Sequence, residues 1–267
     1  MPRIDAHVHG FPDRLAERVR ATLDRAGTLS GGVLVGDVAR RVEDAGFDAA
    51  WLLPYAHRAG VAADVNEWSA AEVTKYSNLV PGATFHPDDT DFEGLVKRAL
   101  VELRLRVVKL HCSVGNFSVD DPRLEPLWRI AADQGVPVTA HAGRENPGIA
   151  AAHEVERLES VLSAHPALKL VLAHSGLPEL ETTVGLMRRY PNLHGDLTPV
   201  WQQPVPVTPE LFAEFPGRFL FGSDAPNCPT PAEDLAREWD QMGLEAELHG
   251  LMMGGAAVSL ASPAFLS

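Results

Sequence analysis

The stretch GVPVTAHAGRENPGIAAAHEVERLESVLSAHPALKLVLAHSG, from Gly135 to Gly176, contains the repeating unit that decides the fold. Two short apolar runs, VPVTA and LKLVLA, each end in a histidine, and residues 149–166 between them have helical spacing. A strand, a helix and a second strand in this order predict a parallel βαβ unit. The two histidines, His141 and His174, would then lie at the same edge of a sheet.

The same alternation extends along the whole chain. Apolar runs occur at 3–10, 48–56, 80–87, 106–112, 135–143, 168–176, 192–199 and 218–226, and helical patterns follow at 37–46, 64–78, 89–103, 120–135, 149–166, 177–191, 208–216 and 230–255. Eight such units predict an α/β fold, a (β/α)8 TIM barrel in which residues 1–267 form a single domain. An open doubly wound sheet is the alternative, but no glycine-rich phosphate loop follows any run. Residues 11–27 predict an additional helix after the first strand that could cover the barrel mouth.

The composition narrows the classes of partner. The 267 residues carry a net charge of −13, which would repel the phosphates of a nucleic acid, so nucleic acid is not expected as a partner. No stretch has the length or apolar character of a membrane span or a signal peptide. Two cysteines form no disulfide framework, which favours a reducing cytoplasm. We expect a small-molecule substrate, no membrane association, and an oligomeric state that leaves a homo-oligomer open.

The first apolar run, RIDAHVHG from Arg3 to Gly10, contains two histidines one residue apart. Side chains two residues apart on a strand share a face. The alternation therefore predicts that Asp5, His7 and His9 face one side, with Ile4, Ala6 and Val8 on the other.

Ionisable residues lie at the ends of several further runs, where TIM barrels build their active sites. They are Lys109 and His111 in the fourth run, His141 in the fifth, His174 in the sixth and Asp224 in the eighth. Buried imidazoles and carboxylates need compensation, and a divalent metal ion supplies it. Imidazoles with a carboxylate suit zinc first, with manganese, iron or nickel as alternatives, and the lack of cysteine ligands argues against a closed structural zinc site.

These motifs together resemble the amidohydrolase superfamily, specifically its amidohydrolase-2 branch, which includes aminocarboxymuconate semialdehyde decarboxylase-like proteins. The resemblance spans the chain through IDAHVH, VVKLHC, VTAHAG, LVLAHSG and FLFGSDAP. It implies a distorted (β/α)8 barrel with one or two divalent metals. Carried over by position, it implies that the ligands of one metal are His7, His9, His141 and Asp224, with His174 near the water or completing a second site.

Lys109 stands where binuclear members of the superfamily carry a carbamylated lysine that bridges two metals. It would be a metal ligand only if carbamylated; as a free ammonium it would instead bind a substrate carboxylate or phosphate. Arg144, whose planar guanidinium can hold a carboxylate by two hydrogen bonds, and His111 are the predicted substrate-binding residues. Asp196, at the end of the seventh run, is assigned to the substrate side.

The first functional hypothesis is a metal-dependent hydrolase in which metal-bound hydroxide attacks the carbonyl of a small amide, lactone or ester. Asp224 would act as general base and then acid, and His174 would help to stabilise the oxyanion. The alternative is a non-oxidative decarboxylase, a lyase, of an aromatic or muconate-like acid. A TatD-like deoxyribonuclease is a third hypothesis, which the net charge disfavours. A non-catalytic barrel would be expected to lack ligands, and none is missing from this chain.

Overall fold

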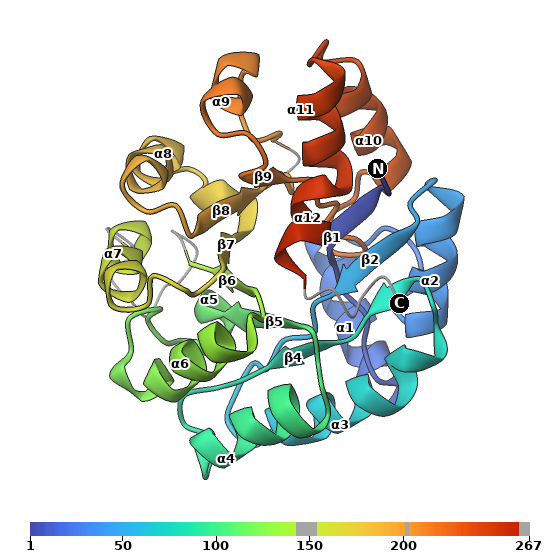
Figure 1. Ribbon diagram of the computed structural model, residues 1–267. Helices are drawn as coiled ribbons and strands as arrows, with labels where there is room; N and C mark the ends of the chain where they lie inside the picture. Colours follow the sequence, from blue (N-terminus) through green and yellow to red (C-terminus); the bar gives the residue numbers. More distant parts are fainter. Residues whose placement is uncertain (143–153, 201–202, 262–267) are drawn as a thin grey trace.

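A computed structural model describes residues 1–142, 154–200 and 203–261 (Figure 1). Its paired strands are parallel and form two sheets, one of order β1-β2-β3 and one of order β4-β5-β6-β7-β8-β9. The strands are β1 (Ile4–Val8), β2 (Ala49–Leu52), β3 (Leu79–Val80), β4 (Gly82–Thr84), β5 (Val107–His111), β6 (Val138–His141), β7 (Leu170–Leu172), β8 (Leu193–Asp196) and β9 (Phe219–Leu220).

The two sheets join into one ring. β3 and β4 belong to a single short segment that is interrupted at Pro81, a residue with no amide hydrogen to donate. At the other junction, the Ala6 amide donates to the Phe221 carbonyl over 2.9 Å and the Asp224 amide donates to the His7 carbonyl, also over 2.9 Å. These bonds close β9 onto β1, and the predicted (β/α)8 barrel is confirmed.

Helices surround the ring of strands (Figure 1). They are α1 (Asp13–Ala26), α2 (Val35–Asp44), α3 (Ala62–Glu72), α4 (Phe92–Lys97), α5 (Cys112–Gly115), α6 (Glu125–Gln134), α7 (Glu154–Ala164), α8 (Leu180–Arg189), α9 (Pro209–Glu214), α10 (Ala232–Asp240), α11 (Ala246–Gly250) and α12 (Ala256–Leu260). The predicted insertion after the first strand is present as α1. The pattern at 230–255 is not one helix, because Gly243 adopts φ +77° and separates α10 from α11. Within the described ranges, no helix is long and apolar enough to cross a membrane.

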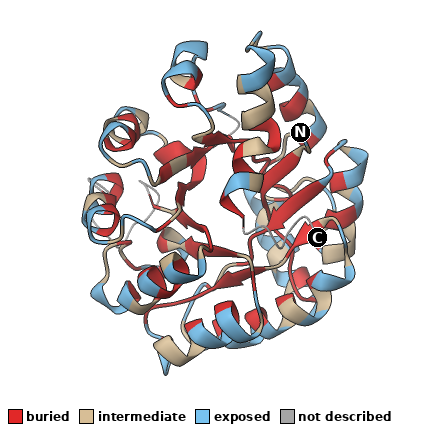
Figure 2. Cartoon of the chain, in the orientation of Figure 1, coloured by how far each residue is buried: buried red, intermediate tan, exposed pale blue. Residues whose placement is uncertain are grey.

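Two apolar cores lie on the two sides of the strands. The larger core fills the layer between strands and helices, whose outer faces are exposed (Figure 2). The smaller core contains alternate residues from around the ring, such as Ile4, Trp51, Val107 and Val171, together with residues of α12. Only the barrel interior can bring these strands' side chains together. The barrel interior is therefore filled with packed apolar side chains, and the polar strand ends lie above this layer, which we call the floor of the barrel.

The predicted faces of the first strand are wrong at Ile4, Asp5 and Ala6. β1 pairs with β2 through Ile4 with Ala49 and Asp5 with Ala50, but the register shifts before Val8 pairs with Leu52. Ile4 and Ala6 belong to the interior core, whereas Val8 belongs to the outer one. Asp5 lines a small cavity between the strands and α2, away from the histidines. A β-bulge interrupts simple alternation, so that His7 and His9 face inward while Asp5 does not.

Candidate metal centre

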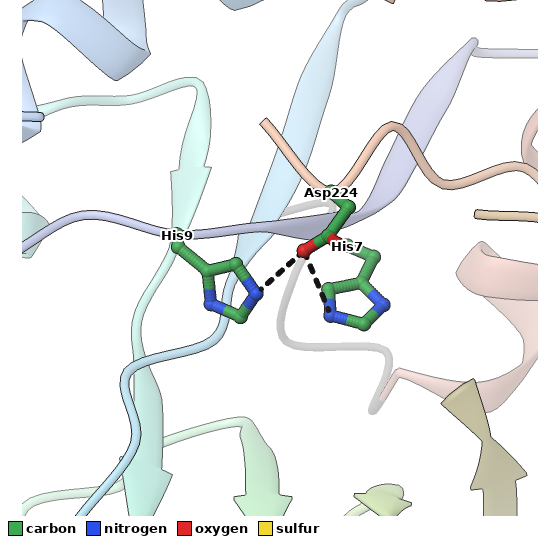
Figure 3. Close-up of side chains that lie close together, drawn as sticks. All are labelled: His7, His9 and Asp224. Atoms are coloured by element: carbon green, nitrogen blue, oxygen red, sulfur yellow. Dashed lines mark ion pairs between the residues drawn. The ribbon is translucent and has the colours of Figure 1, made fainter. Parts of the chain in front are cut away.

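The polar strand ends meet above the floor of the barrel. His7, His9 and Asp224 each offer one ligand atom, and these three atoms lie within 4.8 Å of one another (Figure 3). Asp224 Oδ1 is 2.9 Å from His9 Nε2 and 3.8 Å from His7 Nε2. Both imidazoles are buried, and Asp224 retains a small exposed fraction of its side chain. Residues 217 positions apart in sequence thus form one compact cluster that opens on one side.

Hydrogen bonds to Nδ1, the ring nitrogen that faces away from Asp224, fix the orientation of both imidazoles. His7 Nδ1 lies 2.8 Å from the carboxylate Oδ2 of Asp196, and His9 Nδ1 lies 2.6 Å from the backbone carbonyl of Leu53. Carboxylate and carbonyl oxygens only accept, so Nδ1 carries the proton in both rings. In the neutral rings, both Nε2 lone pairs then face the Asp224 carboxylate. Lone pairs and an anion at these distances repel one another unless a cation or an additional proton lies among them.

Asp224 occupies a constrained backbone position. Its φ is +59°, and its carbonyl accepts hydrogen bonds from the amides of Asn227, over 2.6 Å, and Cys228, over 3.1 Å. Burial alone would raise the pKa of the Asp224 carboxyl, but a hydrogen bond from His9 and the charges of His7, His9 and His174, which these rings offer when protonated, hold that pKa well below its usual range. The side chain is therefore ionised at neutral pH, as a ligand or a base must be.

Three further histidines continue the cluster as a chain of ring contacts. The ring centroids of His174 and His7 are 5.6 Å apart, those of His141 and His174 are 4.7 Å apart, and those of His111 and His141 stack at 4.2 Å. His174 follows β7 with φ +54°, which turns its side chain toward the cluster. Burial is the main cause, and neighbouring positive charge the second, that keeps the pKa of His111 and of His141 well below 6.5. Both rings are therefore neutral.

This donor set fits a divalent metal. Neutral imidazole Nε2 atoms with one ionised carboxylate, oriented by hydrogen bonds to their outer nitrogens, are typical of catalytic metal sites that keep a position open. A family model described as Amidohydrolase matches residues 4–258 of the chain. The chain belongs to the amidohydrolase family. The resemblance of its strand-end motifs to this family is thereby confirmed.

Solved structures with the same fold cover 97% of this chain. A TIM-barrel protein from Bordetella bronchiseptica, described as uncharacterized, has 19% identity, a TM-score of 0.75 and 98% of its own chain covered. A 5-carboxyvanillate decarboxylase from Sphingomonas paucimobilis has 16% identity, a TM-score of 0.70 and 98% covered. A dihydroxybenzoic acid decarboxylase from Polaromonas, with bound manganese and the inhibitor 2-nitroresorcinol, has 16% identity, a TM-score of 0.71 and 96% covered. No curated protein matches in sequence.

Asp196 is more central than the sequence indicated. Beyond its bond to His7, its Oδ1 accepts hydrogen bonds from the His174 amide over 2.7 Å and from the Thr198 hydroxyl over 2.5 Å. Thr198 Oγ1 is in turn 2.7 Å from His174 Nδ1. Asp196 is fully buried and cannot contact a substrate, so its predicted place on the substrate side is wrong. Its carboxylate instead bonds both His7 and the backbone of His174. The sequence could have indicated this role, because Asp196 ends β8 at the same edge of the barrel as the other site residues.

Lys109 lies inside the barrel next to the cluster. The residue is fully buried, and its Nζ is 2.9 Å from His7 Nε2. Burial lowers the pKa of the ammonium to about 8, although the nearby carboxylates of Asp196 and Asp224 oppose the shift. A substantial fraction of the side chain is thus a neutral amine near pH 8.

A cavity of ≈ 250 Å³ lies directly over the polar cluster. Its polar wall includes His141, His174, Asp224 and Asn227, and its remaining lining is Ala26, Gly27, Thr28, Pro199, Val200, Cys228 and Pro229. The end of the inserted helix α1 and the residues after it thus cover part of the barrel mouth, as expected. Arg144, the predicted carboxylate clamp, lies outside the described residues.

Proposed function

We propose that this amidohydrolase-family chain is a metal-dependent, non-oxidative decarboxylase of a small carboxylic acid. The cavity over the cluster carries the proposal. Its volume suits a ligand of about one ring, its polar wall contains His141, His174 and Asp224, and Pro199, Val200 and Pro229 give it apolar walls. A carboxylate bound against these apolar walls would lose part of its hydration, which favours release of neutral CO2 over retention of the anion. Decarboxylases of hydroxylated aromatic acids among the similar structures add support.

A divalent metal held by His7, His9, His141 and Asp224 would supply Lewis-acid polarisation of a substrate oxygen. The chain's own residues would transfer the proton that replaces the carboxylate on the ring carbon. When the bond between the ring carbon and the carboxylate breaks, its electron pair stays on the carbon, and CO2 leaves. The ionised Asp224 side chain would first take a proton from a substrate hydroxyl or from water and then deliver it to that carbon. His174 would orient the substrate through Nε2, because its Nδ1 is committed to Thr198.

Hydrolysis of a small amide, lactone or ester is the second candidate, and Lys109 is the observation that favours it. A buried amine with a pKa of about 8 can add CO2 to form a carbamate, which would offer oxygen ligands to a second metal. Asp224 would then act as general base toward water and as general acid toward the leaving group. Zinc stays our predicted metal for either reaction, and manganese, which is bound in three similar structures, is the first alternative.

The experiment that tests the proposal loads the purified chain separately with zinc and manganese. Hydroxybenzoic acids are supplied in heavy water, and released CO2 and deuterium in the product are measured. We expect CO2 and ring deuteration in equal amounts, lost in Asp224→Asn and retained in Asp133→Asn, an exposed matched control on α6. Turnover of lactones or esters without CO2 release from any acid would overturn the proposal in favour of hydrolysis.

A further inference from the structure

One polar atom in the cavity wall has no partner. Asn227 lines the cavity, and its side-chain oxygen Oδ1 is buried without a hydrogen-bond partner among the described residues. A buried acceptor left unsatisfied costs on the order of 1–3 kcal/mol. Buried polar atoms in folded proteins are nearly always satisfied, so such an atom beside a cavity indicates a missing ligand group.

The side chain of Asn227 is held in place by Tyr55. The two side chains are hydrogen-bonded. Because Oδ1 has no partner, the amide nitrogen must be the atom that donates to the Tyr55 hydroxyl oxygen. Tyr55 is itself fixed by edge-on ring contacts with His9 at 5.3 Å, Phe11 at 5.5 Å and His111 at 5.0 Å. The carboxamide is thus pre-oriented before any ligand binds.

The backbone of Asn227 is also close to the backbone of Asp224, a candidate reacting residue. The Asn227 amide donates to the Asp224 carbonyl over 2.6 Å, so the two residues form one tight turn. This turn uses only backbone atoms and does not require the carboxamide. A substrate that contacts Asp224 would therefore also lie next to Asn227, because both residues line the same cavity.

We propose that Asn227 is a specificity-determining residue whose carboxamide oxygen accepts a hydrogen bond from a hydroxyl or amino group of the substrate. The inference deepens the proposed function and rests on it for the carboxylic acid in the cavity. It narrows the substrate class to small acids that carry a hydrogen-bond donor. An acid without the donor would leave Oδ1 unpaired, and sites built to bond a hydroxyl discriminate strongly against analogues that lack it.

The test measures binding by calorimetry, which is independent of turnover. Benzoate and its three monohydroxy isomers are titrated into the manganese-loaded chain. We expect at least one hydroxy isomer to bind about 5-fold to 150-fold more tightly than benzoate, the factor that corresponds to 1–3 kcal/mol. Equal binding of all four acids, including no measurable binding of any, would overturn the proposal.

Two variants of the same size separate recognition from folding. In Asn227→Leu, which has no acceptor, the hydroxyl preference should fall below twofold while benzoate binds as before. In Asn227→Asp, which keeps an acceptor that the Tyr55 hydroxyl can orient, the preference should persist. An equal loss for every acid in Asn227→Leu would indicate a structural role and overturn the proposal. If the preference holds but no acid releases CO2, the proposed decarboxylation fails and the role of Asn227 stands.

Discussion

Replacing Asp196 by asparagine should weaken metal binding without any change to a ligand. Three donors reach Asp196 Oδ1: the amides of His174 and Thr198 and the Thr198 hydroxyl. The carboxamide oxygen of Asp196→Asn can keep these three bonds. Its amino group then faces His7 Nδ1, where a donor would meet a donor. His7 can restore a hydrogen bond only by moving its proton to Nε2, which removes the lone pair directed at the cluster.

The size of the effect follows from the one bond that changes. A buried hydrogen bond to a charged group contributes about 1.5–3 kcal/mol, which corresponds to roughly 10-fold to 150-fold in an equilibrium constant. Loss of an outer hydrogen bond to a ligating histidine typically weakens metal affinity by 10–100-fold. The His7 to Asp196 contact of 2.8 Å is short and fully buried, so we expect a loss near tenfold or more.

The assay is competition between the protein and a chelator for zinc, with folding checked by circular dichroism. Asp89→Asn is the matched control, because Asp89 also accepts two backbone amides near the strand ends, from Gly60 over 2.7 Å and from His86 over 2.9 Å, but does not contact the cluster. The control should lose stability and keep its metal affinity. Equal zinc affinity in Asp196→Asn and the unchanged chain would refute the tautomer argument.

Three further outcomes are expected. Asp224→Asn should abolish turnover with an unchanged circular dichroism spectrum, because the amide cannot carry the proton. Mass spectrometry under CO2 should show +44 Da on Lys109, the mass of added CO2, only if the hydrolase with two metals is correct; elemental analysis should otherwise find one metal per chain. The third outcome concerns Asp5. Burial is the main cause that raises the pKa of its carboxyl from 3.8 to about 7, and hydrogen bonds from Ser223 and His7 oppose this rise. Folding therefore favours the protonated form of Asp5, so the free energy of unfolding falls as the pH rises. Urea unfolding of the metal-free chain should show this free energy falling by roughly 2–3 kcal/mol between pH 5 and pH 8, relative to the Asp5→Asn variant.

The strand ends could be predicted because each carries its own local signal. A short apolar run, a polar residue and a helical pattern recur in sequence, and parallel strands align their carboxyl ends whatever their partners. His141 and Asp196 are accordingly the last residues of β6 and β8. The break between α10 and α11 also had a signal in Gly243, since a positive φ suits glycine best.

The partnership of Tyr55 with Asn227 had no such signal. The two residues follow different strands and are 172 positions apart, the difference between 227 and 55. Neither belongs to a strand-end motif of the resemblance, and a tyrosine after an apolar run is commonly a core residue. Only the closed ring, with β9 bonded to β1 beside β2, brings them together.

The first strand brings its two histidines onto one face, although the strict alternation predicted for it is wrong. Strict alternation would have placed Asp5 with His7 and His9, yet the bulge between Asp5 and Val8 turns Asp5 outward. There its Oδ1 accepts amide hydrogen bonds from His7 over 3.1 Å and Ser223 over 3.0 Å, so the carboxyl joins β1 to the turn that precedes Asp224. A bulge depends on the partner strand's register and cannot be inferred from one strand's own residues. The same irregularity that defeats the alternation thus aligns the backbone of the two histidines with the backbone of the carboxylate they face.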